Sequence, residues 1–92
     1  SFNPNMAQQD NAYIILGDAY QKLGNHEKAI EYYDKSLKNN TRNPDIYWNK
    51  AMLFSEQGDI AKALEQVTLL AKLDPLRASQ MLQKISKKKV EK

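Results

Sequence analysis

The sequence predicts an all-α fold of two helical hairpins followed by a fifth helix. The main evidence is an internal repeat, in which aromatic, small and turn-forming residues recur at an offset of 34 positions. No stretch alternates apolar and polar residues over strand length. The matched positions are Tyr13 and Tyr47, Gly17 and Ala51, Tyr20 and Phe54, Gly24 and Gly58, Ala29 and Ala63, Tyr33 and Val67, and Thr41 and Pro75.

Length and composition restrict the class of protein. A chain of 92 residues forms one small domain at most, which leaves little room for a catalytic cleft. With 41% apolar and 27% charged residues, the chain fits neither a disordered nor a membrane protein. There is no cysteine, which excludes disulfides and thiolate metal sites. Without a recognisable signal peptide in residues 1–10, we expect a cytoplasmic protein and no membrane partner.

The positive charge is concentrated at the C-terminus. Residues 84–92 hold five lysines against Glu91, a net of +4, whereas residues 1–83 have a net of −1. The lysines could contact phosphates or anionic lipid. Alternatively, they form a solvated helix end whose cations complement the helix dipole. We favour the second interpretation and do not expect a nucleic-acid partner. Other than Tyr47, no aromatic residue lies near enough to these lysines to stack on bases.

Local signals place the helix ends. The pairs Asn3-Pro4, Asn43-Pro44 and Asp74-Pro75 each offer a capping side chain before a proline suited to the first helical turn. Gly24-Asn25 and Gly58-Asp59 predict tight helix–helix turns, in which glycine ends one helix and the next residue caps the following one. The expected helices span residues 4 or 7 to 23, 26–39, 44–57, 60–72 and a segment that follows residue 75.

Apolar residues within these helices recur at the three- and four-residue spacing of a helix face. The first helix has such a face at Ala12, Tyr13, Leu16, Ala19, Tyr20 and Leu23, and the fifth has one at Ala78, Met81, Leu82 and Ile85. Small residues predict where paired helices cross closely, with Gly17 facing Ala29 in the first hairpin and Ala51 facing Ala63 in the second.

These residues resemble the tetratricopeptide repeat (TPR) family, whose signature is aromatic-x2-Leu-Gly-x2-Tyr, then Ala-x3-Phe, then Pro. The first unit reads Tyr13-x2-Leu16-Gly17-x2-Tyr20 and Ala29-x3-Tyr33; the second reads Tyr47-x2-Lys50-Ala51-x2-Phe54, Ala63-x3-Val67 and Pro75. Thr41, Lys50 and Val67 depart from the pattern without changing its period. The resemblance implies a right-handed α-solenoid fragment: residues 1–9 as an extension or helix start, 10–43 and 44–76 as repeats, and 77–92 as a capping helix with a lysine-rich tail.

The resemblance also implies a concave groove lined by the first helix of each pair, which would hold a peptide segment or partner helix. The implied groove residues are Asn11, Ile14, Asp18, Gln21, Asp45, Trp48, Asn49, Met52, Ser55 and Leu82, with Ser79 and Ser86 extending the row. Trp48 either anchors an apolar side chain of the partner or packs against a neighbouring helix and completes the core. The alternative function is self-association, in which the apolar groove or the end of the array contacts a second copy.

Several other sites are not expected. Some TPR proteins hold a chaperone C-terminal carboxylate with lysine, arginine and asparagine side chains, but only Asn49 matches here. The other positions carry Ile14, Asp18, Ser79 and Gln83, so we predict no such clamp. His26 is the single histidine, and no carboxylate pair has a spacing that favours acid–base chemistry. We therefore predict a non-catalytic scaffold without cofactor or metal.

Overall fold

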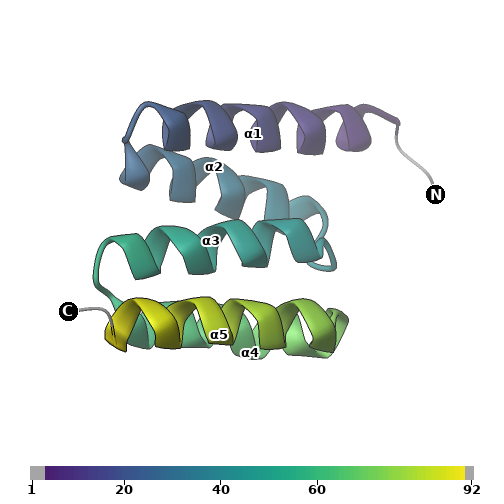
Figure 1. Cartoon of the computed structure of the whole chain (residues 1–92). Coiled ribbons are helices and arrows are strands. Elements are labelled where there is room, and N and C mark those ends of the chain that lie inside the picture. Colours follow the sequence, from purple (N-terminus) through teal and green to yellow (C-terminus); the bar gives the residue numbers. More distant parts are fainter. Residues whose placement is uncertain (1–3, 91–92) are drawn as a thin grey trace. The chain divides into compact units, whose positions relative to one another are not determined.

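The computed structural model describes residues 4–90, and the side chains of residues 11–87. This part of the chain contains helices and no strand (Figure 1), which confirms the all-α prediction. The helices are α1 (Pro4–Lys22), α2 (His26–Asn39), α3 (Pro44–Glu56), α4 (Ile60–Leu73) and α5 (Pro75–Val90). Their bounds agree with the sequence prediction to within one residue at most ends. Asn3 and the end of the lysine-rich tail, residues 91–92, lie outside the described residues.

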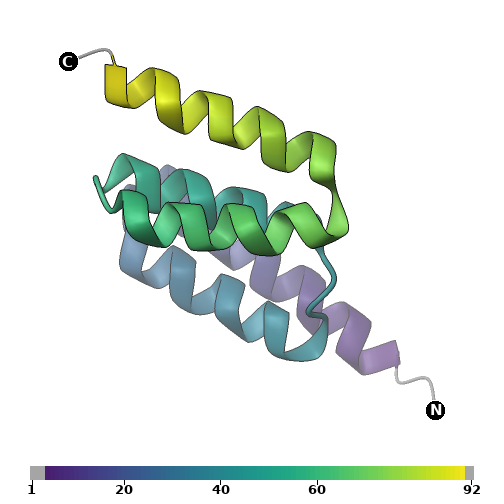
Figure 2. The same ribbon diagram turned by 90° about the horizontal axis from the view of Figure 1, so that it is seen from below.

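The chain divides into two compact units, residues 1–43 and 44–92. In the first unit, α1 and α2 form an antiparallel hairpin (Figure 1). In the second unit, α3 and α4 form another, and α5 packs against α4 and also contacts α3 (Figure 2). Because α5 runs antiparallel to α4, it lies in the same direction as α3. The second unit therefore has a surface to which both α3 and α5 contribute.

The two hairpin turns have the same hydrogen-bond pattern, 34 residues apart. Gly24 and Gly58 have φ of 82° and 83°, a conformation that costs residues with a Cβ about 1–2 kcal/mol. In the first turn, the amide of Gly24 donates to the Gln21 carbonyl at 3.0 Å and that of Asn25 to the Tyr20 carbonyl at 2.9 Å. The second turn repeats both bonds at 3.0 and 2.9 Å. This is the Schellman arrangement, which closes the end of a helix.

The residue after each glycine also begins the next helix. The Asn25 side chain accepts a hydrogen bond from the Lys28 amide at 3.2 Å, and Asp59 accepts one from the Lys62 amide at the same distance. Each side chain thereby satisfies a backbone donor of the first turn that has no partner within the helix. One residue thus closes one helix and caps the next, as the Gly-Asx pairs predict, and the two helices are joined without a longer loop.

The core of the first unit is formed around Tyr33, which is fully buried. Ala29 and Ser36 of α2 are also buried, and from α1 the buried position is Gly17. The prediction of one apolar face on α1 is only partly correct, since Leu16 is 39% and Leu23 78% exposed. The reason is geometric: α2 covers the side of α1 centred on Gly17, and the neighbouring stripe has no cover within the hairpin.

The core of the second unit follows the predicted spacing more closely. Ala51 of α3 and Ala63 of α4 are both fully buried, as expected for a close helix crossing. The fifth helix contributes three buried side chains, and of the four apolar residues predicted for its face, Leu82 remains 45% exposed. The buried residues of α5 are Ala78, Met81 and Ile85. These three positions fix which side of α5 faces α3 and α4.

Candidate partner-binding surface

The predicted groove residues of the first unit lie on one side of α1. Asn11 is exposed, and Ile14, Asp18 and Gln21 are half-buried. Two of them interact with the core: the Tyr33 hydroxyl donates to the Asp18 carboxylate and lies 3.0 Å from Oε1 of Gln21. A hydroxyl has a single hydrogen and donates to one acceptor at a time, so the carboxylate, as the charged acceptor, is the stronger partner.

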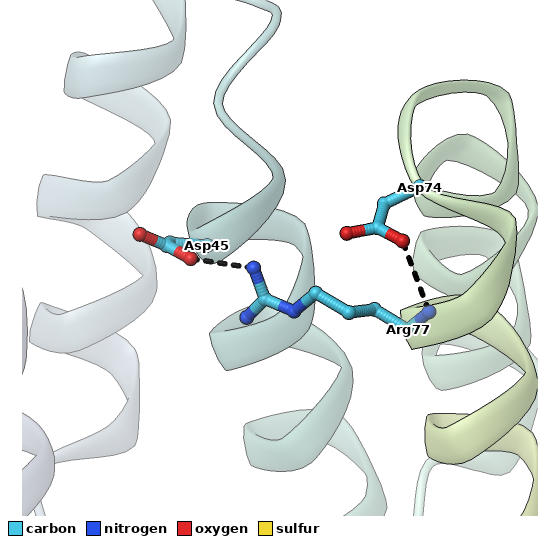
Figure 3. A network of polar contacts seen from close by, with 3 residues as sticks. All are labelled: Asp45, Asp74 and Arg77. Carbon is cyan, nitrogen blue, oxygen red and sulfur yellow. Dashed lines mark hydrogen bonds and ion pairs between the residues drawn. The ribbon is translucent and has the colours of Figure 1, made fainter.

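In the second unit, Arg77 of α5 contacts two of the predicted residues, Asp45 and Trp48, and Figure 3 shows its contact with Asp45. Arg77 Nη1 donates to Asp45 Oδ1 at 2.6 Å, and its guanidinium carbon lies 5.1 Å from the centre of a Trp48 ring. Asp74 fixes the start of α5, because its Oδ1 accepts a hydrogen bond from the Arg77 amide at 3.2 Å (Figure 3). Capping, ion pairing and ring contact together hold the first turn of α5 against the first two turns of α3.

About two turns further along α3 and α5 lies a pocket of about 200 Å³. Its apolar lining comes from Met52 of α3 and from Met81 and Ile85 of α5. The polar and charged residues that line it are Ser55, Glu56 and Lys84. Met81 and Ile85 are almost fully buried, so Met52 offers most of the accessible apolar side-chain surface. The pocket is therefore chemically an apolar cup with charged residues among its lining.

The polar residues of this pocket differ in whether they already interact with other residues of the chain. Ser55 is only 8% exposed, and its hydroxyl has no hydrogen-bond partner among the residues the structure describes. Lys84 is exposed, and it too has no ion-pair partner within the described residues. Glu56, by contrast, already interacts with another part of the chain. The two groups available to a ligand are thus a hydroxyl and a cation.

The structure brings together some of the predicted groove residues and separates others. Met52 and Ser55 share the pocket, whereas Asp45 and Trp48 lie under Arg77 and Asn49 is half-buried outside the pocket lining. On α5, a second and broader hollow of about 510 Å³ includes Leu82. Its other lining residues are Ser79, Gln83, Ser86 and Lys87.

Sequence reasoning missed half of the pocket. The sequence predicts Met81 and Ile85 as core residues, which their burial confirms, and Lys84 as part of the lysine-rich tail, but nothing in it points to Arg77. The helical spacing of Met81 and Ile85 gave their face correctly. The sequence does not show that this face contacts α3 incompletely and leaves an opening beside it.

Within the described residues, no three His, Cys, Asp or Glu side chains gather as a metal site would require. Likewise, none of the helices, over the residues described, combines the length and apolar character needed to cross a bilayer.

Two models of one known protein family match the chain. The tetratricopeptide repeat family matches residues 11–43 and again residues 32–65. The chain belongs to the tetratricopeptide repeat family. TPR units generally mediate protein–protein interactions, and proteins made of them are typically non-catalytic.

Three relatives contain a related segment. A TPR repeat-containing protein of Methanocaldococcus jannaschii is 41% identical over 51 residues, which is 55% of this chain and 9% of the relative. The photosystem I assembly protein Ycf3 of Rippkaea orientalis is 36% identical over 55 residues, covering 58% and 32%. A protein O-mannosyl-transferase of Homo sapiens is 30% identical over 70 residues, covering 72% and 8%. The chain therefore spans a third or less of the length of each relative.

Proposed function

We propose that this chain is a non-catalytic protein-interaction module that binds a peptide segment or partner helix along the groove between α3 and α5. The observation that carries the proposal is the pocket formed by Met52, Met81 and Ile85, since an apolar cup on a small helical unit is suited to receive one apolar side chain of a partner. Met52 and Ser55, two of the residues implied by the TPR pattern, are part of this pocket.

Trp48 has a defined role in this proposal. Its ring lies under the Arg77 guanidinium at one end of the groove, with Met52 one turn further along the same helix. A half-buried tryptophan beside an apolar pocket is well placed to extend the contact with a bound segment. Trp48 would contact the bound segment outside the pocket. Asp45 and Arg77 would then form the polar rim at that end.

The alternative is that the apolar groove binds a second copy of the chain. What favours this possibility is the exposed apolar surface elsewhere in the molecule, including Ile15, at 66% exposure, and Leu23 and Leu76. The molar mass in solution, measured by light scattering over a wide range of concentration, separates the two functions. A mass that stays at one chain supports the peptide-binding module, and one that doubles in the wild type but not in Met52→Lys supports self-association through the groove.

The direct test is selection of displayed random peptides on the immobilised chain. Met52→Lys places an ammonium group over the apolar cup, whereas Leu69→Lys makes the same change at a 39% exposed leucine of α4 and serves as the matched control. We expect selected peptides to share an apolar residue and to bind the wild type and Leu69→Lys, but not Met52→Lys. Peptides that bind all three proteins equally would contradict groove binding. Circular dichroism of each variant verifies that it is folded.

A further inference from the structure

The charges around the α3–α5 pocket identify the chemistry of its partner. Lys84 carries a cation at the pocket, and Lys87, one turn later on α5, carries another at the broader hollow. Both belong to residues 84–92, which have a net charge of +4. Glu56 is the one carboxylate among the residues that line the pocket, and it has an interaction within the chain. The charged side chains that α5 contributes on this side are therefore both cations.

The Ser55 hydroxyl adds a second element of recognition. It is nearly buried, lines the pocket and has no partner within the described residues. A hydroxyl in the lining of a pocket can exchange a hydrogen bond to water for one to an acceptor on a ligand. A carboxylate or a backbone carbonyl next to the apolar side chain can accept from it. The pocket thus combines an apolar cup, a donor and a cation.

From this arrangement we infer that the partner is an internal peptide segment in which an apolar residue is flanked by aspartate or glutamate. The apolar side chain occupies the cup formed by Met52, Met81 and Ile85, and a neighbouring carboxylate pairs with Lys84. A side-chain carboxylate is sufficient for this ion pair, so the segment does not need a free C-terminus. This inference rests on the proposed function, and it specifies the kind of segment that the groove selects.

The test uses synthetic nonapeptides with acetyl and amide ends, each with a central leucine and flanking residues that are all glutamate, all serine or all lysine. A fourth peptide has flanking glutamates and a central glycine. Each peptide is titrated into the isotope-labelled full chain, and the NMR shifts of the Met52, Ser55 and Lys84 amides give the dissociation constant. We expect the glutamate-leucine peptide to bind about three-fold more tightly than the serine-leucine peptide, as is usual for one exposed ion pair.

Two variants assign that preference to one side chain. Lys84→Gln should reduce the difference between the glutamate and serine peptides, while Lys72→Gln, at an exposed lysine of α4, should leave it unchanged. If serine- or lysine-flanked peptides bind as tightly as the glutamate peptide, the inference is overturned and groove binding stands. Equal binding of the central-glycine peptide also overturns it, because charge alone would then account for the affinity. If none of the peptides shifts the pocket amides, both the inference and the proposed function fail.

Discussion

The ring of Tyr33 occupies the space that a side chain at Gly17 would need. A Cβ built on Gly17 would lie 2.6 Å from Cε1 and 2.7 Å from Cδ1 of Tyr33, closer than such atoms approach one another. In the second unit the equivalent positions hold Ala51 and Val67, both buried. In the first hairpin a glycine on one helix therefore faces a tyrosine on the other. In the second hairpin an alanine and a valine share the equivalent space.

This relationship predicts that Gly17→Ala destabilises the protein despite the higher helix propensity of alanine. Tyr33 is fully buried and its hydroxyl is held by Asp18, so the ring cannot easily move away from a new methyl group. Overpacking of this kind, less the gain in helix propensity, should lower the free energy of unfolding by about 1–2 kcal/mol. Urea denaturation followed by circular dichroism measures it.

The control for this prediction is a double-mutant cycle. Tyr33→Val alone should be destabilising, because it leaves a cavity and removes the hydroxyl. In that background Gly17→Ala should cost little or be favourable, since the pair then resembles Ala51 and Val67 of the second unit. Equal costs of Gly17→Ala in both backgrounds would show that the contact with Tyr33 is not responsible.

The turn glycines should respond to substitution for a different reason. A Cβ at Gly58 would meet no atom within 4 Å, so only the left-handed backbone conformation, with φ of 83°, opposes a side chain there. We expect Gly58→Ala to lower the free energy of unfolding by about 1 kcal/mol, and Gly58→Asn to cost clearly less, because asparagine adopts this conformation more readily. Thermal unfolding of the two variants tests this prediction. Equal losses of stability would point to a cause other than backbone strain.

The contact of Arg77 with Trp48 predicts a specific optical change. Arg77→Ala removes the guanidinium from the ring and the hydrogen bond to Asp45, which should expose Trp48 and shift its fluorescence to longer wavelength. Since Asp45 is 66% exposed, the pair contributes modestly, and we expect a loss of stability of about 1 kcal/mol. Trp48 is the only tryptophan, so the signal reports this site alone.

Two further variants serve as controls for the shift in Trp48 fluorescence. Arg77→Lys keeps a positive charge but not the planar group that lies over the indole, so it should give an intermediate shift. Arg42→Ala, at an exposed connector position, should leave the fluorescence unchanged. An unaltered spectrum for Arg77→Ala would show that the arginine does not shield the tryptophan in solution.

The features that could be predicted from the sequence are those with local causes. The Gly-Asx pairs fix both the left-handed residue and the cap, so both hairpin turns and the helix bounds were correct. The exposure of Leu16 and Leu23 on α1 was not predictable in this way, because helical spacing shows that residues share a face but not whether another helix covers it.

The same distinction applies to the candidate site. Met52 and Ser55 followed from the repeat pattern, since equivalent positions of each first helix lie on one side. Lys84 could be assigned only after α5 had been placed, because its position at the pocket depends on which side of α5 packs against α3. Tertiary packing, rather than any local preference, decides that orientation.

A last prediction concerns Ser36, whose side chain lies in the core of the first unit. The residue is 1% exposed, and within the part of the chain that the structure describes its hydroxyl has no hydrogen-bond partner. A buried donor without a partner is unfavourable, and alanine fills nearly the same volume, so Ser36→Ala should raise the free energy of unfolding by about 0.5–1 kcal/mol. Ser79→Ala, at an exposed serine of α5, corrects for the small difference in helix propensity. If Ser36→Ala proves less stable than the wild type, the hydroxyl has a partner in solution, such as a buried water molecule.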